Sequence, residues 1–325
     1  MVDGSLPRGN AAVVLNRCVP GSPDPPQKSG LLLCRAVRRR LQLSEHRLGV
    51  IGIAFITFDL DGTLVDSPFE RIVLPRVWQK LEAYGVREPR EALIREQLKR
   101  FAQDRRVDAF HWDDLVMTIA REQGVDWTDR LEDLVRGELG ERISQETFFD
   151  DVPQALDLLR ARGYQCGVIS NGYVRYQKAL FDRMSLTHYF DAFLGPDVLG
   201  IAKPDPQVFA HEALRSGVAM HVGDLLTQDV TVAKRAGILA VMVARPKQVT
   251  ADFARLAEYA PRVRPHVALR EGWLLSQYEK EHRYLRRNIP PEPLNSASDA
   301  FPDAIVLSFS ELENLLEDGA PRSEG

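Results

Sequence analysis

The chain has 325 residues, of which 44% are hydrophobic and 27% are charged, a balance typical of globular proteins and sufficient for two domains. Its formal net charge is −4, yet residues 1–50 carry eight lysines and arginines against three acidic residues, so the rest of the chain is acidic. An acidic body argues against nucleic acid as a partner, because contacts to its phosphates need clustered lysine and arginine.

Neither the hydropathy nor the cysteines point to a membrane or a secreted protein. No apolar run approaches the roughly 20 residues that a bilayer span needs, so no membrane partner is expected. The three cysteines, Cys18, Cys34 and Cys166, form no C-x-x-C pair. Structural thiols in a reducing compartment are the simpler interpretation, which predicts a cytoplasmic protein.

Residues 1–48 are predicted to be a disordered leader. Five prolines occur by position 26, with glycine and serine between them, and such a segment buries too little apolar surface to offset its ordering entropy. Residues 34–48 could instead form a basic amphipathic helix with a membrane-surface or targeting role. A solvated leader, or upstream sequence translated in the wrong frame, is the favoured interpretation.

From residue 51 onward, short apolar runs alternate with helical stretches. Pro153 opens a helix that Gly163 closes, and Ser308 with Glu311 forms a capping box for another. Near-continuous Ile, Val, Leu and Phe indicates strands covered on both faces. The strands are predicted at 51–59, 164–170, 218–224, 238–244 and 304–309. Their alternation with helices predicts an α/β fold with a doubly wound parallel sheet.

Residues 68–147 interrupt this alternation with helical spacing and no strand candidate. We therefore expect an all-helical domain inserted after the first strand. The α/β core is expected to comprise residues 49–67 and 148–325. Within it, residues 250–303 form a second, irregular insertion rich in charged and aromatic residues.

The predicted strands end in polar residues. In open α/β sheets, ligands bind outside the carboxyl ends of the strands, so these residues should meet at one edge. Taken singly, Asp-Gly and Ser-Asn-Gly are more often turns, and Lys-Pro more often leads into a helix. The residues that the topology brings to this edge are Asp59, Asp61, Ser170, Asn171, Lys203, Asp224 and Asp229.

Four converging carboxylates require a cation. Two carboxylates ~4 Å apart repel by roughly 4 kcal/mol at an effective dielectric of about 20, and Lys203 alone offsets too little of this. A hard divalent ion suits all-oxygen ligands, and Mg²⁺ typically binds one or two carboxylates, waters and a substrate phosphate. We therefore expect Mg²⁺ at this edge, with Asp224 among its ligands and Asp229 orienting a metal-bound water or Lys203.

A metal-bound carboxylate beside a phosphate ester can act as a nucleophile. Asp59 is placed to attack phosphorus and form an aspartyl-phosphate. Asp61, two residues on, would protonate the leaving oxygen and then deprotonate the hydrolytic water. Ser170, Asn171 and Lys203 would bind the non-bridging phosphate oxygens.

These motifs resemble those of the haloacid dehalogenase superfamily, in the family's order and over roughly residues 51–245. The matching segments are "DLDGT" at 59–63, Ser170 in "ISNG", Lys203 in "AKPDP", and Asp224 with Asp229 in "GDLLTQD". The resemblance implies that the backbone carbonyl of Asp61 coordinates Mg²⁺, and that 68–147 is a cap which opens and closes over the site. The dehalogenase branch lacks an aspartate at Asp61 and uses no metal, so this residue favours phosphoryl chemistry.

The sequence therefore predicts a Mg²⁺-dependent phosphatase acting on a small phosphorylated metabolite. The stretch that follows Ser170 is similar to the branch of nucleotide and sugar-phosphate phosphatases, and a phosphoglycolate-like ester is a further candidate. A phosphomutase of the same superfamily is the alternative enzyme. A non-catalytic binding module, using the leader and residues 250–303 as an interface, is the alternative of another class. Whether the chain forms a homo-oligomer is left open.

Five other residues are expected to have structural roles. His221 is expected to be a core strand residue, because the histidines show no metal-ligand spacing. Trp78 and Trp112 are expected in the core of the helical insert. Arg71 and Arg175 could contact a substrate, but surface salt bridges are the simpler expectation.

Overall fold

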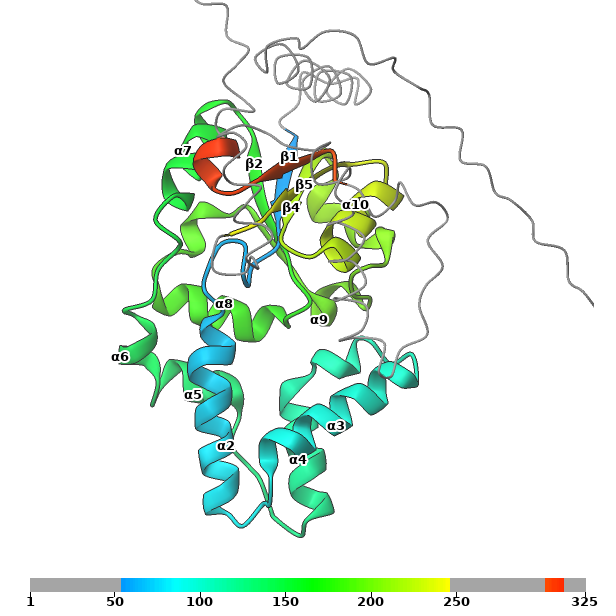
Figure 1. Cartoon of the computed structure of the whole chain (residues 1–325). Coiled ribbons are helices and arrows are strands. Elements are labelled where there is room, and N and C mark those ends of the chain that lie inside the picture. Colours follow the sequence, from blue (N-terminus) through cyan, green and yellow to red (C-terminus); the bar gives the residue numbers. More distant parts are fainter. Residues whose placement is uncertain (1–53, 246–301, 313–325) are drawn as a thin grey trace, which may run out of the picture.

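A computed structural model describes residues 54–245 and 302–312 of the chain (Figure 1). The predicted leader at 1–48, with Cys18 and Cys34, and most of the predicted insertion at 250–303 lie outside the described residues. Cys166 is buried and unpaired, and burial raises the pKa of its thiol to about 12. It is therefore an inert core residue, as expected.

Six parallel strands form one sheet, in the order β3-β2-β1-β4-β5-β6. The strands are β1 (Phe55–Phe58), β2 (Gln165–Ile169), β3 (Ala192–Leu194), β4 (Val218–Gly223), β5 (Leu239–Val243) and β6 (Ala304–Val306). The chain builds outward from β1 in both directions, which confirms the predicted doubly wound parallel sheet. The direction in which the chain adds strands reverses between β1 and β4. Doubly wound sheets bind their ligands at this point.

Helices cover both faces of the sheet (Figure 1). Ile56 and Phe58 pack in one buried cluster with Leu156 of α7, whereas Phe55 packs in another with Val232 of α10. This division follows from the strand period, because successive side chains point to opposite faces. The elements around the sheet are α7 (Val152–Ala161), α8 (Val174–Arg183), η3 (Thr187–Tyr189), α9 (Pro196–Leu199), η4 (Pro206–Phe209), η5 (Glu212–Leu214), η6 (Leu226–Val230) and α10 (Thr231–Arg235).

The predicted strand positions are correct, but their lengths are not. β3 was missed, because three residues give no readable periodicity. The last strand ends at Val306 instead of residue 309, since Phe309 begins a helical turn at 309–312. Ser308 accepts a hydrogen bond from the backbone N–H of Glu311 at 3.3 Å, which is one half of the expected capping box.

The residues between β1 and α7 form helices and, in the described chain, no strand. They are η1 (Phe69–Val73), α2 (Leu74–Ala83), α3 (Pro89–Ala102), η2 (Asp108–Phe110), α4 (Trp112–Glu122), α5 (Leu131–Arg136) and α6 (Gly140–Ile143). Figure 1 shows them gathered beyond α8, with the chain entering α2 after β1. The domain limits 49–67, 68–147 and 148–325 stay a prediction.

None of the helices in the described ranges is both long enough and apolar enough to cross a membrane.

Candidate active site

Backbone pairing at the carboxyl edge of the sheet places the first two motifs. The N–H of Asp59 donates to the carbonyl of Val222 at 2.8 Å, so Asp59 continues the β1–β4 ladder by one residue. The N–H of Ser170 likewise donates to Leu194 at 3.0 Å and extends the pairing of β2 with β3. Both side chains are buried at the point where the parallel strands end.

Lys203 joins two carboxylates that come from different strands. Its ammonium Nζ lies 2.5 Å from Oδ1 of Asp59 and 2.5 Å from Oδ1 of Asp229, and all three side chains are buried. Oδ2 of Asp229 accepts a hydrogen bond from the N–H of Leu225 at 2.9 Å. Gly223 makes room for this carboxylate, because a Cβ at that position would lie 2.3 Å from Cγ of Asp229.

The pKa values of the two carboxylates beside Lys203 are shifted in opposite directions. Burial raises the pKa of Asp59 to about 6, with Lys203 lowering it and Asp229 raising it further. Burial also opposes ionisation of Asp229, but Lys203 and His221 more than compensate and lower its pKa. The pKa of Lys203 is raised, because Asp229 and Asp59 outweigh the effect of burial. Lys203 is thus paired with both carboxylates, and Asp229 is the one whose ionised form this site favours.

The acidic side chains can hold a metal ion. Carboxylate oxygens of Asp59, Asp224 and Asp229 all lie within 4.8 Å of one another. Both oxygens of Asp229 accept hydrogen bonds, and Oδ1 of Asp59 accepts one from Lys203, so both of these carboxylates are already in contact with the ammonium. Thr63 donates to Oδ1 of Asp224 at 3.5 Å and ties that side chain to the loop after β1. Hard oxygen donors of this kind suit a hard divalent cation.

Asp61 lies outside this carboxylate group. Its Oδ2 accepts a hydrogen bond from Nε2 of Gln177 at 3.1 Å, and its Oδ1 is buried without a partner among the described residues. Burial, with the negative charges of Asp59 and Glu70, raises its pKa to about 7. The chain turns sharply here because Gly62 adopts φ +84°, a left-handed conformation that glycine tolerates without strain.

Ser170 and Asn171 differ in what their side chains do. Oγ of Ser170 accepts a hydrogen bond from the N–H of Gly172 at 3.0 Å. The Asn171 amide accepts from the N–H of Lys203 at 2.8 Å and donates to its carbonyl at 3.3 Å. It also donates to Oε1 of Gln228 at 2.7 Å. The Asn171 side chain therefore holds the backbone of Lys203 in place, a role that the sequence did not suggest.

His221 lies in β4 behind the ion pair. It is buried, as expected of a core strand residue, and its Nδ1 lies 2.9 Å from Oγ1 of Thr57. Its Nε2 lies 3.5 Å from Oδ1 of Asp229, which places a second polar neighbour against that carboxylate. Sequence reasoning missed this contact, because a single histidine in an apolar strand carries no motif.

Arg245, two residues after the end of β5, was also missed. Its guanidinium donates to the carbonyl of Thr63 at 2.9 and 3.3 Å and to the Asp151 carboxylate at 3.0 and 3.2 Å. The group lies 3.8 Å from the ring centroid of Phe149, and Asp151 also accepts from the N–H of Phe309 at 2.7 Å. Arg245 thus joins the loop after β1 to the segment that enters α7. In the sequence, the position of Arg245 near the end of a strand is the one feature that could have identified it.

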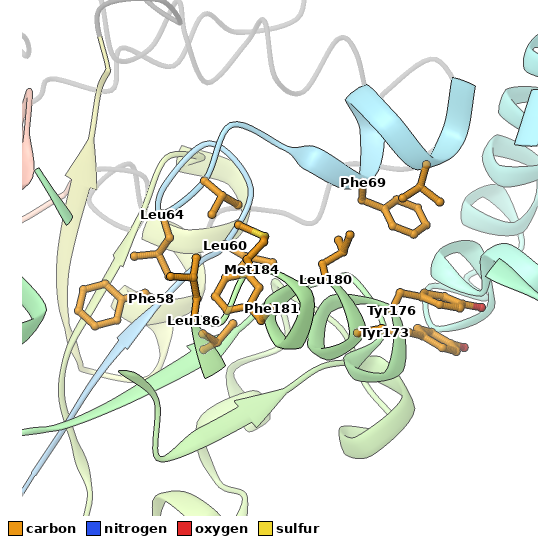
Figure 2. Close-up of a cluster of buried hydrophobic side chains, with 14 of the residues drawn as sticks. Phe58, Leu60, Leu64, Phe69, Tyr173, Tyr176, Leu180, Phe181, Met184 and Leu186 are labelled. Carbon is orange, nitrogen blue, oxygen red and sulfur yellow. The ribbon is translucent and has the colours of Figure 1, made fainter. Parts of the chain in front are cut away.

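The start of α8 contacts the helical insert. Figure 2 shows Tyr173 and Tyr176 beside Phe69, whose ring lies 5.7 Å from that of Tyr176. The Tyr176 hydroxyl donates to the Asp113 carboxylate at 2.9 Å. Arg175 stacks over Tyr176 with 4.9 Å to the ring centroid and lies 3.5 Å from Asp113. The salt bridge expected for Arg175 is present, and it joins α8 to α4.

The sequence is similar to those of several phosphatases. A glyceraldehyde 3-phosphate phosphatase from Pyrococcus furiosus is 26% identical over 219 residues, covering 65% of this chain and 88% of the relative. A phosphoglycolate phosphatase from Aquifex aeolicus is 28% identical over 203 residues, covering 56% and 80%. A glyceraldehyde 3-phosphate phosphatase from Methanopyrus kandleri is 33% identical over 103 residues, and this match spans 30% of the chain and 44% of that relative's length.

A solved structure has the same fold. The structure of a HAD phosphatase from Thermococcus onnurineus superposes with a TM-score of 0.52 at 22% identity, over 82% of this chain and 99% of the other. The family of haloacid dehalogenase-like hydrolases matches residues 53–237, which is more than half of the sequence. The match contains all four motifs and the helical insert between the first two. The chain therefore belongs to the haloacid dehalogenase-like hydrolase family.

Proposed function

We propose that this protein is a Mg²⁺-dependent phosphatase that hydrolyses a small phosphate ester through an aspartyl-phosphate on Asp59. The observation that carries the proposal is the placement of Asp59 at the end of β1, in contact with the Lys203 ammonium and grouped with Asp224. One bound ester could therefore reach three kinds of group: a nucleophilic carboxylate, a cation for its phosphate oxygens, and oxygen ligands that hold a metal ion. Relatives named as phosphatases support the same reaction.

Asp59 and Asp224, with the backbone carbonyl of Asp61, would hold Mg²⁺. A bound ion would neutralise negative charge on the phosphate, which otherwise repels the attacking carboxylate. Lys203 would bind a non-bridging oxygen, and Ser170 a second one. Asn171 and Asp229 support this arrangement by holding the backbone and the ammonium of Lys203.

The reaction has two displacements at phosphorus. In the first, a carboxylate oxygen of Asp59 forms a bond to phosphorus as the bond to the ester oxygen breaks, and Asp61 gives its proton to that oxygen. In the second, Asp61 accepts a proton from water, whose oxygen attacks phosphorus and breaks the bond to Asp59. Inorganic phosphate leaves, and both aspartates return to their starting states.

The substrate is proposed to be a small metabolite. The relatives are named for glyceraldehyde 3-phosphate and phosphoglycolate, both compact phosphate esters. The helices inserted after β1 contact the start of α8 beside the site, and as a cap they would exclude macromolecules. A nucleotide or another sugar phosphate belongs to the same class. The cytoplasmic location and the absence of nucleic-acid and membrane partners stay predictions, and the oligomeric state stays open.

Release of p-nitrophenol from p-nitrophenyl phosphate, with and without Mg²⁺, tests the reaction directly. Activity that requires the ion and disappears in Asp59→Asn supports the proposal. Glyceraldehyde 3-phosphate, phosphoglycolate, glucose 1-phosphate and nucleoside monophosphates then test the substrate class. Isomerised sugar phosphate in place of inorganic phosphate would favour the phosphomutase, and an intact chain no more active than Asp59→Asn would favour the binding module.

A further inference from the structure

Gln177 is a buried polar residue on α8 that the reaction above does not use. Its Nε2 donates a hydrogen bond to Oδ2 of Asp61 at 3.1 Å, and within the described residues this is the one hydrogen bond that the Asp61 side chain makes. Gln177 is 5% exposed, and its own Oε1 is buried without a partner among the described residues. An unsatisfied buried oxygen is unfavourable, and an apolar side chain would avoid it. The amide donor is the feature that distinguishes this position from its apolar neighbours.

The loop after β2 is built to let Gln177 reach Asp61. The side-chain amide lies directly against Gly172, where a Cβ would come within 2.2 Å of Nε2 and 3.0 Å of Cδ. Gly172 is not among the residues with positive φ, so the backbone there accepts any residue. A side chain at position 172 would therefore have to displace the Gln177 amide from where it lies.

A neutral donor suits a carboxyl group that must both give and take a proton. A lysine or arginine in place of Gln177 would add a charge and favour the ionised form of Asp61 throughout. An amide adds no charge, restrains rotation of the carboxyl group and accepts either protonation state. Because Nε2 donates to Oδ2, that oxygen acts as an acceptor, and the free Oδ1 is the oxygen left to carry a proton.

We propose that Gln177 is a positioning residue for Asp61: its amide holds Oδ2 and thereby turns Oδ1 toward the departing oxygen of the phosphate ester. The inference rests on the proposed phosphatase function and adds a residue to it. Gly172 takes part through the space that it leaves. Proton transfer depends on a short, aligned hydrogen bond, so a carboxyl group that rotates freely is a poorer acid.

The test compares esters with different leaving groups. An alkyl phosphate such as glycerol 3-phosphate needs its leaving oxygen protonated, whereas p-nitrophenolate leaves without help. In Gln177→Met, which keeps the length of the side chain but has no donor, kcat/KM for the alkyl ester should fall by about 10- to 100-fold. The value for p-nitrophenyl phosphate should fall much less, because kcat/KM reports the first displacement.

Two further variants separate positioning from packing. Gly172→Ala should reproduce the selective loss of Gln177→Met, because the added Cβ displaces the amide without altering its chemistry. In a Gln177→Ala background, the same Gly172→Ala change should have little additional effect, since nothing remains to displace. Lys178→Met, an exposed neighbour on α8, is the matched control and should leave both esters unaffected. Thermal melts of every variant report whether the fold is intact.

The outcomes are distinguishable. An equal loss with both esters in Gln177→Met would mean that Gln177 only packs, and no loss with either ester would mean that Asp61 does not need it. Either result overturns this inference and leaves the phosphatase proposal standing. A wild-type chain that releases phosphate from neither ester would overturn the proposed function and this inference with it.

Discussion

Replacing Asp61 by asparagine should make the protein more stable at alkaline pH while damaging its catalysis. Asp61 is held in a site that disfavours its ionised form, because burial and the charges of Asp59 and Glu70 raise its pKa from 3.8 to about 7. Asparagine has nearly the same shape, remains neutral and can still accept the Gln177 hydrogen bond. The variant therefore removes the unfavourable ionisation and keeps the packing.

The sign and size follow from proton linkage. An acid whose pKa is higher in the folded state lowers stability as pH rises from its unfolded value, here 3.8, through the folded value near 7. At about 1.4 kcal/mol per pH unit, the full shift corresponds to a ceiling of roughly 4 kcal/mol at pH 8. Asp61 is partly exposed, so solvent screening reduces the expected gain to about 2 kcal/mol.

Urea unfolding with EDTA present, followed by circular dichroism at pH 8 and at pH 4.5, measures the effect. The chelator matters because an ion that binds the folded state would mask the difference. Asp61→Asn should raise the free energy of unfolding by about 2 kcal/mol at pH 8 and by much less at pH 4.5. Asp126→Asn, which removes an exposed carboxyl, is the control and should change little. An equal gain at both pH values, or none at pH 8, would refute the reasoning.

Further predictions concern the proposed nucleophile, the proposed acid and two contacts outside the proposed reaction centre. Asp59→Asn should abolish turnover with the circular dichroism spectrum unchanged, because Lys203 keeps its pairing with Asp229; substantial residual phosphate release would exclude Asp59 as the nucleophile. Asp61→Asn should lower kcat for an alkyl phosphate by roughly 10²–10⁴-fold in the presence of Mg²⁺, and an unchanged rate would assign the acid role elsewhere. Arg245→Met should lower the free energy of unfolding by about 2–4 kcal/mol, since it leaves the Asp151 carboxylate without its cation; a loss below about 1 kcal/mol in urea titrations would contradict this. Tyr176→Phe removes a hydroxyl that donates to the Asp113 carboxylate and accepts from the N–H of Asp113 and from Arg175, and it should lower the melting temperature by a few degrees, equivalent to about 1 kcal/mol.

The amino-acid pattern was sufficient for five of the six described strands and for the acidic edge of the sheet. A strand covered on both faces must be apolar along its length, so the runs around Ile56, Val168 and Val222 could be recognised without knowing their neighbours. Parallel strands joined by helices end at the same edge, which brings Asp59 and Asp224 together from topology alone. The helical insert was likewise visible, because its periodicity is local.

Only the tertiary structure decided which side chains support these groups. Gln177 and Asp61 are 116 residues apart, and Arg245 and Thr63 are 182 apart, so no local pattern relates them. The same holds for Asn171, whose Ser-Asn-Gly context indicates a turn and not a bridge to Lys203. The identity of a catalytic carboxylate follows from chemistry that each residue carries by itself. Its orientation depends on hydrogen bonds between distant segments, and these form only when the sheet and the helices have packed.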